Sequence, residues 1–143
     1  MEETVMVDRQ VVVAKVALVE KAVARIRAKR PASLEQFLAE PDLQDIVMFN
    51  IVQALQGCID LAAHVVSDEG YGMAGSMNEF FYLLEEQGVL PADLVERMVQ
   101  AVGFRNLCVH EYARLDLAKV HAIAASGLSD IEEFIGLMLQ RYS

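Results

Sequence analysis

The chain has 143 residues, 55% of them hydrophobic, and a formal net charge of −9 at pH 7. This length fits one domain with a buried core, which we expect to span residues 1–143. Because phosphate contacts dominate nucleic-acid affinity, the acidic balance excludes a general nucleic-acid binder, DNA included, so any RNA must meet a local basic cleft or a partner that brings charge.

A stripe of apolar residues predicts a first helix over about residues 4 to 29. Its members recur every three or four positions, which places them on one face of a helix: Val12, Val16, Val19, Val23 and Ile26. Pro31 stops the pattern.

Basic residues gather toward the end of this helix: Lys21, Arg25, Arg27, Lys29 and Arg30. Residues 31 to 90, by contrast, contain no Lys or Arg. Two interpretations stay open. The cluster is either a solvated helix end whose charge matches the helix dipole, or a patch that contacts phosphate.

A capping box at Ser33 opens a short helical turn that ends at Pro41, and a second long helix follows over about residues 42 to 66. From Ile46 to Ile59 this helix has no charged residue. Solvent-facing helices normally carry Lys or Glu, so we expect burial on nearly every side, at the centre of a bundle or at a dimer interface.

The same helix carries a polar stripe whose members share one face: Asn50, Gln53, Gly57, Asp60 and His64. These groups either satisfy one another and meet solvent, or line a cleft opposite the Arg105 segment. In the second case Asp60, with His64, positions an arginine or a histidine of that segment.

Cys58 and Cys108 lie in apolar helical runs, where we expect reduced, buried thiols. With only three histidines besides, no metal-ligand spacing is recognisable, so we expect no metal and no cofactor. No run of 18 uncharged apolar residues exists, and the acidic start Met1-Glu2-Glu3 lacks the features of a signal peptide. We therefore expect a cytoplasmic protein without a membrane span.

Six further signals mark where the remaining helices begin and end. A capping box at Ser76 opens a helix that ends at Gly88, and Pro91 suits the first position of the next. Asp116 could cap another helix, Gly127 breaks the pattern, and a capping box at Ser129 opens the last helix. The sequence thus predicts an all-α fold: an antiparallel, up-down four-helix bundle with one extra short helix.

Arg105 and His110 are the strongest candidates for catalytic residues. Arginine offers a permanent cation whose planar fork matches phosphate oxygens, and histidine exchanges protons near neutral pH. The pair suits RNA cleavage without metal. Five residues of helix turn through about 500°, so the two side chains point roughly 140° apart. Either the helix ends between them, or a two-fold dimer brings two copies together.

With Asn106 and Tyr112, this segment resembles the Arg-polar-x3-His-x-Tyr signature of HepT-like toxins in the HEPN superfamily. The resemblance implies a type VII HepT/MntA-like toxin–antitoxin system. In it, a homodimer forms a composite endoribonuclease site with Arg105 and His110 catalytic and Asn106 positioning. It also implies a neighbouring MntA-like nucleotidyltransferase antitoxin that transfers AMP to Tyr112 and blocks cleavage of the RNA substrate.

Two alternatives remain. The chain could be a non-catalytic HEPN module that docks a nucleotidyltransferase and serves as its substrate or scaffold. It could also be a purely structural helical dimer. In that case Arg105 pairs with Asp60 or Glu111, and His110 is a core histidine whose hydrogen bonds are made within the protein. Tyr112 is then an aromatic residue at the edge of the core with its hydroxyl in solvent.

Overall fold

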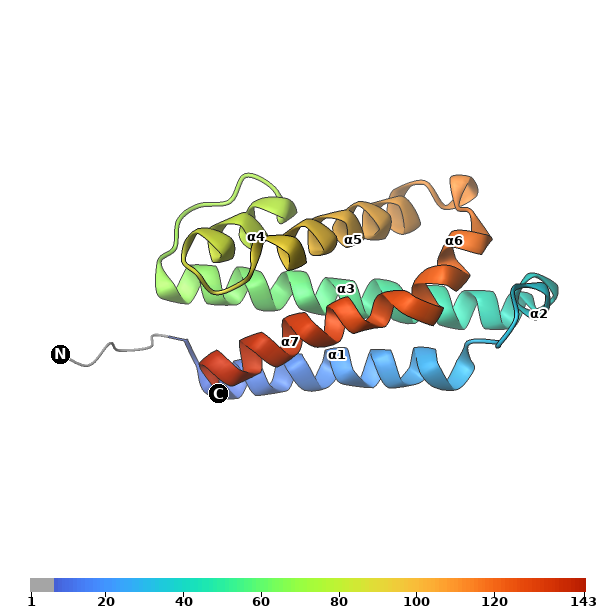
Figure 1. Cartoon of the computed structure of the whole chain (residues 1–143), viewed down its shortest axis with the longest axis horizontal. Helices are drawn as coiled ribbons and strands as arrows, with labels where there is room; N and C mark the ends of the chain where they lie inside the picture. The colour runs from blue at the N-terminus through green and yellow to red at the C-terminus, as the bar shows by residue number, and fades with distance from the viewer. Residues whose placement is uncertain (1–6) are drawn as a thin grey trace.

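The computed structural model describes residues 7–143, and that part of the chain folds into helices. Four long helices run up and down beside one another (Figure 1): α1 (Arg9–Lys29), α3 (Pro41–Glu69), α5 (Ala92–His110) and α7 (Leu128–Tyr142). Three shorter helices complete the bundle: α2 (Leu34–Ala39), α4 (Met77–Glu86) and α6 (Leu117–Ala122). The expected all-α bundle is confirmed, with three short helices where one was expected.

α3 is the central helix, since it packs against α1, α4, α5 and α7. Its uncharged segment buries residues such as Val47, Ile51 and Leu55. The other helices of the described chain leave one edge of α3 uncovered, where Phe49 is 63% exposed and Gln53 faces solvent. Burial of this edge at a dimer interface stays a prediction.

Length and composition alone would allow α3 to cross a membrane, and among the described helices it is the one that qualifies. Half of its most apolar window is buried inside the bundle. A core helix of a bundle is expected to be this apolar, so packing accounts for the composition.

Several helix ends follow the predicted caps. Ser33 Oγ accepts from the Gln36 N–H at 3.1 Å, and Asp116 Oδ1 accepts from the Ala118 N–H at 2.9 Å. α1 begins at Arg9 behind an Asp8 cap, and the expected start at residue 4 lies outside the described residues.

Two caps differ from expectation by small amounts. The Ser76 side chain makes no capping hydrogen bond, although Glu79 Oε2 reaches back to accept from the Gly75 N–H at 2.7 Å. Pro91 is the N-cap of α5 and precedes the first helical position. Gly88, at φ +72°, takes the left-handed conformation expected after α4.

The predicted break at Gly127 was wrong. α6 continues through a π-helical turn, η2 (Ile123–Gly127), directly into α7. Ser129 therefore lies inside α7 and caps nothing; its Oγ donates to the Ser126 carbonyl at 3.4 Å. Ala124 and Leu128, buried on either side of the junction, tie this turn to the core and favour a continuous helical path.

Arg97 fixes α5 against α7. Its guanidinium donates to Asp130 and Glu133 of α7, each at 2.9 Å, and to Asp93 of its own helix at 3.3 Å. At the far end, His121 Nε2 lies 3.0 Å from the Pro31 carbonyl oxygen and so links α6 to the turn after α1. These two links flank the segment 105–112 and hold it in place.

Candidate functional site

The segment that carries Arg105 and His110 is regular helix throughout. α5 extends to His110, and its last turn closes with a 2.9 Å bond from the Glu111 N–H to the Leu107 carbonyl. The possibility that the helix ends between the two residues is therefore wrong. Because they lie five positions apart on one helix, their side chains diverge by roughly 140°. A single chain does not direct both at one phosphate.

Arg105 has no carboxylate partner within residues 7–143. Its Nη1 donates to Asn106 Oδ1 at 3.0 Å, and its Nε is buried without a hydrogen-bond partner. Glu111, proposed as a structural partner, lies 3.6 Å from Arg114, and Asp60 is engaged within α3. A half-buried guanidinium without a counter-ion is suited to bind an anion such as phosphate.

His110 is exposed at the last position of α5, so the alternative of a core histidine was wrong. An exposed imidazole can accept a proton from a bound molecule and return it. The structure therefore places a cation and a proton-exchanging group at the same end of one helix.

Tyr112 begins the short 3-10 helix η1 (Tyr112–Arg114) and is 61% exposed. Its hydroxyl donates to Asp45 Oδ1 of α3 at 3.4 Å, which is a long hydrogen bond. The residue also borders a shallow pocket of about 220 Å³, lined by Asp45, Met48, Phe49, Val52, Cys108 and Tyr112. The hydroxyl is accessible and has an acceptor beside it.

Asp45 and Phe49 were not identified from the sequence. The sequence does contain a pattern that points to them, because Asp45, Phe49 and Gln53 recur at every fourth position and share one helix face. Two of the three are polar, which indicates an exposed edge.

Asp60 and His64 occupy a more distant part of α3. Asp60 Oδ1 accepts from Gln56 Nε2 at 2.8 Å, and His64 Nε2 pairs with Asp68 Oδ2 at 3.0 Å. Along α3, Asp60 lies about 22 Å from Asp45, at about 1.5 Å per residue. The structure does not bring Asp60 or His64 to Tyr112, and their positioning role stays a prediction.

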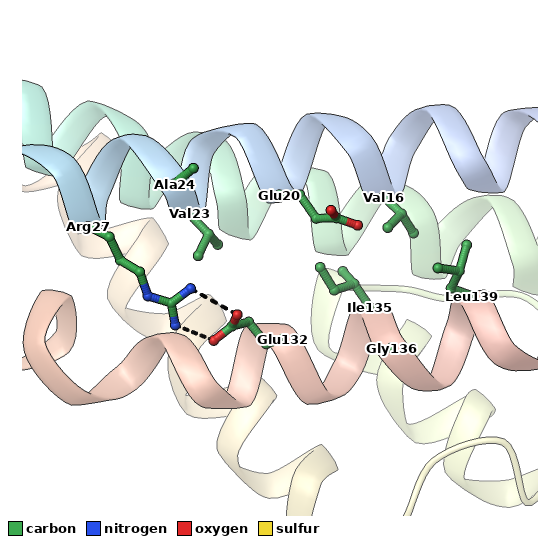
Figure 2. A pocket seen from close by; sticks show the side chains of 9 residues that line it. All are labelled: Val16, Glu20, Val23, Ala24, Arg27, Glu132, Ile135, Gly136 and Leu139. Atoms are coloured by element: carbon green, nitrogen blue, oxygen red, sulfur yellow. Dashed lines mark hydrogen bonds and ion pairs between the residues drawn. The ribbon is translucent and has the colours of Figure 1, made fainter.

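Two grooves flank α1. The α1/α3 groove, about 700 Å³, is lined by Leu18, Lys21, Ala22, Arg25, Asp45, Ile46, Phe49, Asn50, Gln53, Gln56, Gly57 and Asp60. The α1/α7 groove, about 520 Å³, is lined by Val16, Glu20, Val23, Ala24, Arg27, Glu132, Ile135, Gly136 and Leu139 (Figure 2). Four of the five members of the polar stripe, all except His64, thus line the α1/α3 groove, and the segment 105–112 contributes no residue to either groove.

Cys58 and Cys108 are free and buried, as expected. Burial raises the pKa of the Cys108 thiol to about 11, and that of Cys58 further, so neither is a thiolate at neutral pH. In the part of the chain that the structure describes, no three His, Cys, Asp or Glu side chains are placed to hold a metal ion.

Comparisons with known proteins agree with this arrangement. Residues 19–138 match the family model described as "Ribonuclease HepT-like". The chain is 29% identical over 128 residues to the "mRNA nuclease HepT" of Shewanella oneidensis, covering 90% of this chain and 96% of that protein.

Two of the solved structures that share the fold come from toxin–antitoxin complexes. One is a tri-AMPylated Shewanella oneidensis HEPN toxin in complex with MNT antitoxin, at 29% identity and a TM-score of 0.83, with 90% of this chain and 96% of that chain covered. The other is a toxin–antitoxin with AMP-PNP, at 28% identity and a TM-score of 0.83, with 90% and 97% covered.

Proposed function

Because the chain belongs to the HepT-like ribonuclease family, we propose that it is the toxin of a type VII HepT/MntA-like toxin–antitoxin system and cleaves RNA. The observation that carries the proposal is Arg105, a half-buried guanidinium without a carboxylate partner, on the same helix end as the exposed His110. The named activity of the Shewanella oneidensis relative supports it.

A homodimer completes the site in this proposal. One chain directs Arg105 and His110 roughly 140° apart, so a two-fold axis near the end of α5 is needed to bring a cation and an imidazole to one phosphate. Phe49, Val109 and Tyr112 are 63%, 45% and 61% exposed around this end. Exposed apolar side chains beside a polar site are suited to contact a second copy.

The chemistry follows from these groups. One His110 of the dimer accepts the proton of a ribose 2′-hydroxyl, and the oxygen attacks the adjacent phosphorus. Arg105 stabilises the negative pentavalent phosphorus, with Asn106 orienting its guanidinium through the 3.0 Å bond. A water molecule protonates the departing 5′-oxygen, and the hydroxide that remains takes back the proton held by His110, so each site uses one His110. The products are a 2′,3′-cyclic phosphate and a 5′-hydroxyl, and no metal ion is required.

Regulation is proposed at Tyr112. An MntA-like nucleotidyltransferase would let the tyrosine oxygen attack the α-phosphorus of ATP, which releases pyrophosphate and the hydroxyl proton. The exposed hydroxyl permits this reaction, and AMPylation of the Shewanella oneidensis toxin supports it. The adenylyl group adds bulk and negative charge beside the site and repels RNA. Intact-mass spectra should gain AMP units with the antitoxin, and Tyr112→Phe should lose the increment assigned to this position.

A second candidate is a non-catalytic module that docks the nucleotidyltransferase as a substrate or scaffold. The accessible Tyr112 hydroxyl favours it, because AMP transfer needs Tyr112 and does not need His110. In both proposals the protein acts in the cytoplasm and contacts neither membrane nor DNA.

The deciding experiment incubates labelled RNA with the wild-type dimer and with His110→Ala. General acid–base catalysis typically contributes about 10²–10⁴-fold, so the variant should lose cleavage by that factor. Arg105→Lys should fail too, because a point charge does not reproduce the planar fork. EDTA should leave the rate unchanged, and the fragments should end in 2′,3′-cyclic phosphate.

Circular dichroism and gel filtration serve as controls for the fold and the dimer. Undiminished cleavage by folded His110→Ala would contradict the assigned mechanism. Absence of cleavage by every form, with a folded dimer, would favour the docking module.

A further inference from the structure

We propose that the α1/α3 groove binds the sugar–phosphate backbone of a single-stranded RNA segment, with Lys21 and Arg25 as the phosphate-contacting residues. The inference rests on the proposed ribonuclease function and deepens it, since it identifies where substrate outside the cleavage site is held.

Lys21 and Arg25 are exposed cations on the groove side of α1. In residues 7–143 neither forms an ion pair, whereas Arg27 of the same helix is bonded to Glu132. The chain has a net charge of −9, with 21 acidic and 12 basic side chains, so carboxylates are in excess. Two neighbouring cations that have no carboxylate partner in such a chain form a local site for an anion.

The opposite wall supplies neutral hydrogen-bonding groups. Asn50, Gln53 and Gln56 of α3 line it, and the exposed Gln53 amide is suited to meet ribose or phosphate oxygens. Gly57 keeps the two helices close, because a Cβ there would lie 2.6 Å from Val19 Cγ2. The cations of α1 and these amides therefore line the same groove.

Carboxylates mark the two ends of the groove. Asp45 lies at one end and Asp60, bonded to Gln56, at the other. These charges repel phosphate, so they confine the proposed backbone contact to the middle, where Lys21 and Arg25 lie. The lining chemistry thus fits a short polyanionic segment better than an extended duplex.

The groove also adjoins the segment 105–112. Asp45 and Phe49 line both the α1/α3 groove and the pocket beside Tyr112. RNA held by Lys21 and Arg25 would therefore lie beside the pocket at the end of α5, with Asp45 between its phosphates and Tyr112. An adenylyl group on Tyr112 would stand at this junction, which gives the modification a direct way to exclude RNA.

The test measures binding of a short fluorescein-labelled single-stranded RNA by anisotropy, with dimeric His110→Ala protein so that the probe is not cleaved. Lys21→Ala/Arg25→Ala in that background should bind roughly tenfold or more weakly, because two charged contacts are lost. The slope of log affinity against log salt should fall by about 1.4, since each single-strand phosphate contact contributes about 0.7.

The matched control, Lys15→Ala/Arg27→Ala, removes the same charge from α1 outside this groove and should leave both quantities near the parent values. Equal weakening by the two double variants would overturn the groove while leaving RNA cleavage intact. Loss of binding to the purified nucleotidyltransferase, with RNA binding unchanged, would also overturn it and assign the surface to that protein. No RNA binding by the parent would overturn the groove and the ribonuclease function together.

Discussion

The two grooves along α1 use their cations in opposite ways. On the α7 side, Arg27 is bonded to Glu132, with Nη1 2.9 Å from Oε2, and the rest of that groove is mostly aliphatic (Figure 2). On the α3 side, Lys21 and Arg25 face amides and form no ion pair within the described chain. One helix thus carries both a structural cation and available cations. Whether a cation of this cluster is structural or available depends on whether a carboxylate lies across its groove. Its position within the cluster does not decide this.

A glycine in each groove shows a second difference. A Cβ at Gly57 would lie 2.6 Å from Val19 Cγ2, whereas a Cβ at Gly136 would meet nothing within 4 Å. The helices α1 and α3 are therefore in close contact, while Val16, Ile135 and Leu139 stand between α1 and α7 (Figure 2). The close approach of α1 to α3 therefore depends on Gly57, whereas the packing of α1 against α7 does not depend on Gly136.

Alanine at these two glycines should produce the largest difference in stability. Gly57→Ala forces its methyl group against buried Val19, whose branched side chain has little freedom to move, and should lower the free energy of unfolding by about 1–3 kcal/mol. Gly136→Ala should raise it by up to about 1 kcal/mol, because alanine favours helix without a clash. Urea unfolding of both variants measures the difference, and equal changes would show that the two gaps are alike.

A smaller effect is expected from Glu132→Gln, which removes the counter-ion of Arg27. The pair is exposed, so the free energy of unfolding at neutral pH should fall by less than about 1 kcal/mol. The hydrogen bond from Arg27 lowers the pKa of the Glu132 carboxyl in the folded state. Its contribution is therefore present above the ordinary carboxyl pKa and is lost as pH falls through the lowered value.

The difference between wild type and Glu132→Gln should accordingly disappear in acid. Thermal unfolding at neutral pH and below the carboxyl range checks this. A difference that persists in acid would assign the effect to packing in the α1/α7 groove and not to the ion pair.

Much of the fold could be predicted from local patterns. The apolar stripe predicted α1, and Ser33 and Asp116 are the N-caps that the sequence predicted. Both signals depend on residues no more than about one helical turn apart. The continuous path from α6 into α7 could not be predicted. Gly127 and Ser129 favour a helix break locally, and burial of Ala124 and Leu128 in the bundle overrides that preference.

The candidate site divides in the same way. The spacing of the motif identified Arg105, Asn106, His110 and Tyr112 as candidates, since all four lie within one short segment. The proximity of Tyr112 to Asp45 depends on how α5 packs on α3, and local spacing does not contain that information. The uncovered edge at Phe49 could not be predicted for a related reason, because an uncharged run does not reveal which edge the neighbouring helices leave uncovered.

If each cleavage site takes Arg105 from one chain and His110 from the other, mixing two inactive variants should restore cleavage. Arg105→Ala and His110→Ala are each expected to be inactive alone. After subunit exchange, half of the dimers are mixed and each has one intact site of two, so activity should recover to about one quarter of wild type. Sedimentation equilibrium confirms that dimers are present throughout. A mixture of folded dimers as inactive as its components would contradict the composite site.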